Sequence, residues 1–89
     1  MIDRTLRIVN EKGLHARASA KFVEVVERYD ADAEVSKDGM SVSGDSIMGL
    51  LMLAASRGTS IEVRTSGREQ QELADALIAL VANRFGEDY

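Results

Sequence analysis

The chain has 89 residues, of which 45% are hydrophobic and 29% charged, with no cysteine and a formal net charge of −4. This length predicts one domain over residues 1–89. The lack of cysteine excludes disulfides and thiolate metal sites, and the scattered basic residues of an acidic chain argue against nucleic acid as a partner.

The N-terminus has no basic segment followed by an apolar run, so we expect no signal peptide. The longest apolar run, residues 47–55, contains Gly49 and is too short to cross a bilayer. Both features predict a cytoplasmic protein that does not insert into membranes.

The first part of the chain predicts a strand, a turn and a helix. Apolar and polar residues alternate over residues 2–9, as in a half-buried strand, and residues 10–13 follow as a polar turn. Residues 16–29 place apolar side chains three and four positions apart, which predicts a helix with one buried stripe. The stripe contains Ser19, Phe22, Val23, Val26 and Tyr29.

The middle of the chain predicts a β-hairpin. Residues 33–37 and 40–43 alternate at a period of two. Between them, Asp38-Gly39 favours a type I′ turn, in which both central residues need a positive φ.

A short apolar helix, a strand and a longer helix follow the hairpin. The apolar run 47–55 predicts the short helix, which Arg57-Gly58-Thr59 ends, and residues 61–65 predict the strand. Residues 69–85 predict the last helix, with a stripe of Leu73, Leu77, Ile78, Val81 and Phe85. The element order predicts an α+β open-faced β-sandwich, in which three helices cover one face of a four-stranded antiparallel sheet.

His15, the single histidine, lies between the turn and the first helix. The first N–H groups of a helix lack acceptors and carry partial positive charge, which suits an anion. The same field disfavours a protonated ring, and a neutral ring has a nucleophilic lone pair. A phosphoryl group on His15 would then lie beside the backbone of Ala16 and Arg17, and the Arg17 side chain can add charge-assisted hydrogen bonds. Gly13 permits the turn, and Leu14 anchors it to the core.

The alternative for His15 is a surface helix-capping residue without chemistry. A metal site is disfavoured because no second histidine or cysteine is present, and no G-x-S-x-G motif indicates a hydrolase.

Two segments carry a family resemblance. GLHARASAKFVE, residues 13–24, resembles the phosphorylation-site segment of HPr, the histidine-containing phosphocarriers of the phosphoenolpyruvate-dependent phosphotransferase system. SIMGLLMLAASRG, residues 46–58, resembles that family's second signature, and the spacing, hairpin and element order also agree. The resemblance implies that Enzyme I phosphorylates His15, on Nδ1 in this family, and that IIA-type proteins receive the group for sugar transport. Such a monomeric carrier needs no cofactor and turns over nothing alone.

The chain departs from the family at Ala18, where proline usually follows His-Ala-Arg. Proline suits the first turn of a helix because its φ is fixed. Alanine is the best helix former, so we expect the helix to form with a less rigid start.

Ser46 has two predicted roles. From the sequence it is the N-cap of the short helix; by the resemblance it is also a regulatory site for HPr kinase/phosphorylase. A phosphate there adds roughly −2 charge beside an apolar surface and should weaken docking without refolding the protein.

The short helix has almost no polar face, so a small domain must leave part of it exposed. We expect Leu50, Leu53 and Ala54 to fill the core, and Ile47, Met48 and Leu51 to face water. The resemblance implies a partner-docking surface made of Ala20, Ile47, Met48, Leu51 and Met52.

Two other functions stay open. One is a nitrogen-related (NPr-type) regulatory paralogue of the same system, which shares the His15 chemistry and differs in its partners. The other is a non-catalytic α+β interaction domain with an idle histidine.

Overall fold

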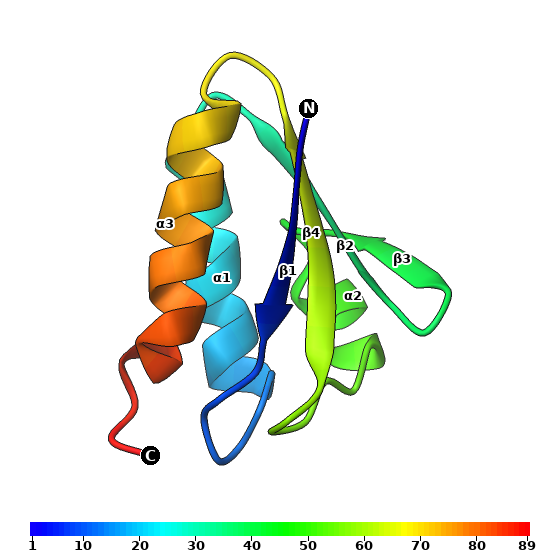
Figure 1. The fold of residues 1–89 in the computed structure, drawn as a ribbon, viewed down its shortest axis with the longest axis vertical. Helices are drawn as coiled ribbons and strands as arrows, with labels where there is room; N and C mark the ends of the chain where they lie inside the picture. The colour runs from blue at the N-terminus through cyan, green and yellow to red at the C-terminus, as the bar shows by residue number, and fades with distance from the viewer.

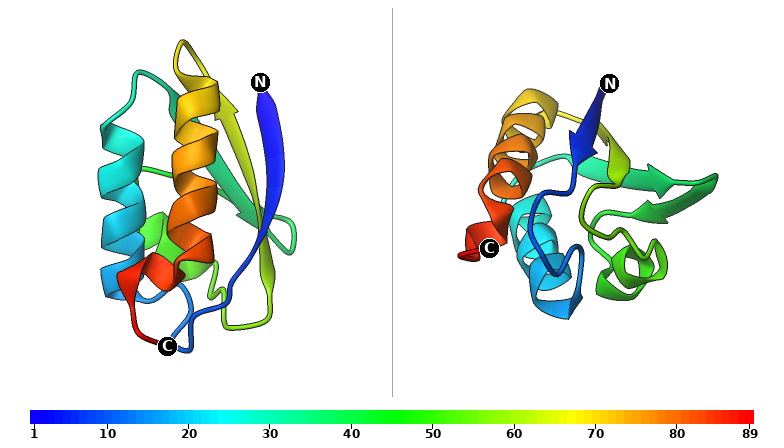
Figure 2. Two further views of the ribbon diagram at one scale, coloured as in Figure 1. Left: turned by 60° about the vertical axis from the view of Figure 1, so that its left-hand side comes forward. Right: turned by 60° about the horizontal axis from the view of Figure 1, so that its bottom comes forward.

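Four strands and three helices follow one another in the predicted order in a computed structural model that describes residues 1–89. The strands form one antiparallel sheet in the order β1-β4-β2-β3. All three helices lie on the same face of this sheet (Figures 1 and 2), which confirms the predicted open-faced sandwich. The elements are β1 (Ile2–Arg7), α1 (Ala16–Glu27), β2 (Asp32–Lys37), β3 (Met40–Ser43), α2 (Ile47–Met52), β4 (Ser60–Ser66), α3 (Gln70–Ala82) and the 3-10 turn η1 (Arg84–Gly86).

The sheet has one apolar and one polar face because side chains alternate along each strand. In β4, which pairs with both β1 and β2, Ile61 and Val63 are buried under the helices while Glu62 and Arg64 face solvent. The β2–β3 hairpin turns at Asp38 and Gly39, whose φ values of 51° and 83° are both positive. The predicted type I′ turn is therefore confirmed.

The hydrophobic core lies between the sheet and the helices. Its largest side chains are fully buried and come from every layer: Phe22, Phe85, Ile8, Leu50, Ile61, Leu73 and Leu77. Burying a side chain of this size stabilises the fold by about 1.5–3 kcal/mol, so this layer fixes the position of the loops at its edge.

Helix α2 ends at Met52, three residues earlier than predicted. Leu53 is its C-cap, and Ala54 has a φ of 50°, a left-handed conformation that stops a helix. The prediction that Ala54 fills the core is wrong because this turn exposes Ala54 and buries Ala55 instead. Leu50 and Leu53 are buried as predicted.

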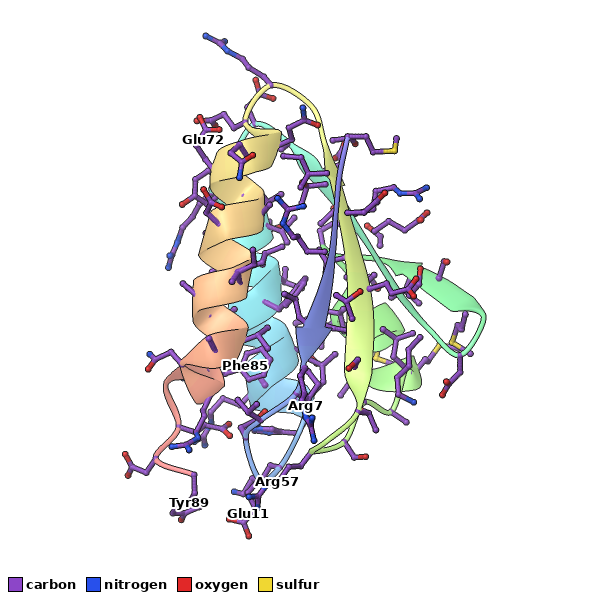
Figure 3. The ribbon with its side chains drawn as sticks, in the orientation of Figure 1. Arg7, Glu11, Arg57, Glu72, Phe85 and Tyr89 are labelled. Carbon is purple, nitrogen blue, oxygen red and sulfur yellow. The ribbon has the colours of Figure 1, made fainter.

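Helix α3 ends at Ala82 and not at residue 85, because Arg84 and Phe85 have φ values of 56° and 54°. The Phe85 side chain is nevertheless fully buried, close to α1, while Tyr89 lies exposed at the end of the tail (Figure 3). Ile78 is only half-buried. The break after α3 redirects the C-terminal tail toward the turn that precedes α1 (Figure 2).

Two other predicted elements are shorter in the structure. Helix α1 ends at Glu27, where residue 29 was predicted, and β1 ends at Arg7, where residue 9 was predicted. The pairing of β1 continues locally, since the Ile8 N–H donates to Thr59 O at 2.8 Å. No helix has the length and apolar character needed to span a membrane.

Candidate functional site

His15 is the N-cap residue of α1. Its φ and ψ of −79° and −177° are extended, its side chain caps nothing, and its carbonyl accepts the first helical hydrogen bond, from the Ser19 N–H at 2.8 Å. The N–H groups of Ala16, Arg17 and Ala18 precede that bond and have no acceptor within the helix. The His15 side chain is 28% exposed, so the ring lies in reach of solvent at the positive end of α1.

The turn before His15 requires glycine at position 13. Gly13 has a φ of 66°, and a Cβ atom there would lie 2.5 Å from Ala55 O. The neighbouring Leu14 is buried, and its N–H donates to the same Ala55 O at 2.8 Å. Leu14 thus anchors the turn to the core, as predicted, and fixes where α1 begins. Helix α1 also forms with alanine at position 18, as expected.

The C-terminal tail brings a carboxylate to the ring of His15. One oxygen of Glu87, Oε2, is in hydrogen-bond contact with His15 Nε2, and the other, Oε1, accepts from Asn10 Nδ2 at 3.0 Å. Asn10 is fully buried, and its Nδ2 also donates to Gly13 O at 2.8 Å. Asn10 therefore connects the turn, the tail and, through Glu87, the histidine.

Burial raises the pKa of the Glu87 carboxyl, but hydrogen bonds from Asn10 and His15 lower it more. The nearby positive charges of His15 and Lys12 act in the same direction, and the net pKa of Glu87 lies below its ordinary value. Glu87 is therefore ionised at neutral pH.

The ionised carboxylate changes the electrostatics predicted for His15. Its negative charge lies beside the ring and opposes the field of the helix N-terminus, so the helix alone does not determine the electrostatics of the ring. The contact engages Nε2, while Nδ1 makes no hydrogen bond within the protein. Sequence reasoning missed Glu87 because no motif marks an acidic tail residue as the partner of a ring 72 positions away. It missed Asn10 because Asn10 acts through Glu87 and does not contact the ring itself.

Basic side chains surround the tail. Arg17 is exposed and lines a surface hollow together with Lys12, Lys21 and residues 86–89. Lys21 Nζ donates to Phe85 O at 2.7 Å, whereas the Arg17 guanidinium takes part in no hydrogen bond or ion pair within the protein. Arg17 is thus free to bind an anion that arrives at the start of α1. A larger hollow of about 430 Å³ on the uncovered face of the sheet does not include His15.

Ser46 is the N-cap of α2, as predicted, because its Oγ accepts a hydrogen bond from the Gly49 N–H at 3.0 Å. The helix that follows Ser46 has three exposed apolar side chains: Ile47, Met48 and Met52, which are 40%, 70% and 63% exposed. Leu51 is half-buried, which is less exposed than expected, and Ala20 on the neighbouring α1 is also half-buried. These residues give α2 an apolar outer surface.

Comparison with known proteins assigns the chain to a family. The model of the "PTS HPr component phosphorylation site" family matches residues 2–83. The chain belongs to the HPr family, as the sequence resemblance predicted. It is 46% identical over 87 residues to the phosphocarrier protein HPr of Cupriavidus necator, and the match covers 98% of each chain. HPr proteins are phosphocarriers of the phosphotransferase system, and this chain is of that type.

Solved HPr structures share the fold over 90% or more of this chain. The crystal structure of an HPr from Thermoanaerobacter tengcongensis matches with a TM-score of 0.95 at 35% identity and covers 100% of both chains. The HPr of Bacillus anthracis matches with a TM-score of 0.85 at 36% identity, over 90% of this chain and 95% of that one. The family model ends at residue 83, so Glu87 lies outside the matched residues.

Proposed function

We propose that His15 accepts a phosphoryl group from Enzyme I and passes it to IIA-type proteins. The observation that supports this most directly is the His15 ring at the N-terminus of α1, with Nδ1 unengaged. Three backbone N–H groups without helical acceptors and a free guanidinium lie around the same helix start. A nucleophile, an anion site and a cation therefore occur together.

In the proposed reaction, the lone pair of Nδ1 attacks the phosphorus atom. The new P–Nδ1 bond forms as the bond from phosphorus to the donor breaks, and that bond's electron pair stays with the donor. The N–H groups of Ala16 and Arg17, with the Arg17 side chain, stabilise the phosphoryl oxygens. Transfer to the next protein runs through the same steps in reverse. Phosphoryl transfer depends mainly on positioning and charge stabilisation, so a monomeric cytoplasmic domain of residues 1–89 needs no cofactor.

The outer surface of α2 is the proposed docking surface: Ile47, Met48 and Met52, with Ala20 and Leu51 at its edge. Methionine suits several partners because its side chain adapts in shape. Ser46 is the half-buried residue that caps this helix. Phosphorylation by HPr kinase/phosphorylase would place roughly −2 charge beside the docking surface, which opposes binding to acidic partners.

Incubation with Enzyme I and labelled phosphoenolpyruvate tests the proposal. We expect an acid-labile, base-stable label that is absent from His15→Ala, and its transfer to purified IIA proteins. A label that persists in His15→Ala, or no label on the wild type, would overturn the assignment. Transfer to nitrogen-related IIA proteins alone would instead identify the regulatory branch.

A further inference from the structure

The tail reaches His15 because two contacts hold it in place. The buried Phe85 side chain fixes the segment after α3, and Lys21 Nζ from α1 donates to Phe85 O at 2.7 Å. Two residues later, Glu87 is mostly buried, with a side-chain exposure of 15%. Its carboxylate therefore lies at the ring as part of the folded structure.

Asn10 fixes the orientation of that carboxylate. Its Nδ2 donates to both Glu87 Oε1 and Gly13 O, while its buried Oδ1 has no partner. Leaving a buried oxygen unpaired costs free energy. The amide nevertheless presents its donor to Glu87, which leaves Oε2 for the histidine.

Resting on the proposed function, we infer that Glu87 is a positioning residue that holds a proton on His15 Nε2 and keeps the lone pair on Nδ1. An ionised carboxylate is an acceptor only, so the ring nitrogen that contacts it must be the donor. In a neutral imidazole the other nitrogen then has the lone pair. Glu87 thus presents Nδ1 to the incoming phosphoryl group without touching that group itself.

The same contact stabilises the phosphorylated ring. When Nδ1 bonds to phosphorus and Nε2 keeps its proton, the ring gains a positive charge, and the phosphoryl donor keeps the electron pair of the broken bond. Glu87 compensates the charge on the ring, and a protonated ring remains a good leaving group for the second transfer. A carboxylate that only anchored the tail would leave the chemical step unchanged.

The test compares Glu87→Ala with Glu11→Ala in the full chain. Glu11 is an exposed acid of the turn that points outward (Figure 3) and forms no hydrogen bond or ion pair, so its replacement changes the net charge equally. Two quantities are measured: the His15 Nε2 proton signal by NMR, and kcat and KM for phosphoryl transfer from Enzyme I. We expect Glu87→Ala to lose the protected Nε2 proton signal and to lower kcat about tenfold. KM should stay unchanged, since the docking surface lies on α2.

Several results would overturn the inference. A protected Nε2 proton in Glu87→Ala, an unchanged kcat, an effect on KM alone, or equal losses in Glu11→Ala would each remove the positioning role. The NMR signal requires no phosphoryl transfer. A wild type that shows the protected proton but accepts no label would therefore refute the proposed function and not the contact.

Discussion

Gly13 couples the stability of the turn to the position of His15, so Gly13→Ala should perturb both. A non-glycine residue at a φ of 66° costs about 1–2 kcal/mol. The new Cβ would lie 2.5 Å from Ala55 O and 3.0 Å from Ser56 Cα, and relieving such overpacking costs about 1–3 kcal/mol. We expect a loss of about 2–5 kcal/mol, which lowers Tm by roughly 8–40 °C in a domain of this size.

Gly39→Ala provides the matched control. Gly39 has a φ of 83°, but a Cβ atom there would have no heavy atom within 4 Å, so only the backbone cost of about 1–2 kcal/mol applies. Urea and thermal unfolding of both variants measure the difference. Enzyme I should label folded Gly13→Ala more slowly than Gly39→Ala, because displacing Ala55 O also displaces Leu14 and the start of α1. Equal losses of stability in the two variants would refute the contact argument.

Three further substitutions test separate parts of the structure. Ala54→Gly should increase the free energy of unfolding by about 1 kcal/mol and raise Tm by several degrees, because Ala54 is exposed and has a φ of 50°; a lower Tm would contradict this. Arg17→Ala should slow labelling about 10- to 100-fold, as expected for a lost charge-assisted hydrogen bond, with an unchanged Tm; wild-type kinetics would remove Arg17 from the phosphate site. Met48→Asp should weaken Enzyme I binding about tenfold in calorimetry, since Met48 is 70% exposed on α2; unaltered affinity would count against the docking surface.

Local sequence signals predicted the parts of the fold that depend on neighbouring residues. Asp38-Gly39 predicted the β2–β3 turn, and Ser46 predicted the N-cap of α2. The alternation of apolar and polar residues predicted which face of β4 is buried. The breaks at Ala54 and at Arg84 and Phe85 were missed because residues other than glycine adopt positive φ there. Tertiary packing imposes these conformations, as when the buried Phe85 ring fixes the chain after α3, and local propensity does not reveal them.

The residues of the candidate site also fall into two groups, those determined by local sequence and those determined by tertiary packing. His15, with Gly13 and Leu14, could be predicted because a helix start has a chemistry that follows from its own backbone. The contact with Glu87 depends on where α3 stops and how the tail turns back, and that break was not predictable. The sequence therefore predicted His15 as the nucleophile, but not Glu87, the group that we propose selects the reacting ring nitrogen.

The contact with Glu87 also makes stability depend on pH in a defined window. The folded pKa of Glu87 lies below the ordinary value of 4.5, because hydrogen bonds from Asn10 and His15 outweigh the effect of burial. The folded state therefore binds fewer protons than the unfolded state as Glu87 titrates. Its stabilisation is fully present above the unfolded pKa and is lost as pH falls through the folded pKa.

Thermal unfolding of wild type and Glu87→Ala should show this window directly. At pH 6 we expect the wild type to melt about 2–8 °C higher, which corresponds to a contribution of about 0.5–1 kcal/mol for a partly exposed ionic contact. The difference in Tm should narrow as pH falls below 4.5 and close once pH lies below the folded pKa, where the carboxylate is protonated in both states. Glu11→Ala should follow the wild type throughout. If the difference in Tm between the wild type and Glu87→Ala were as large at pH 2 as at pH 6, apolar packing and not the ionised carboxylate would hold the tail in place. Glu87 would then make no electrostatic interaction with the His15 ring that stabilises the fold.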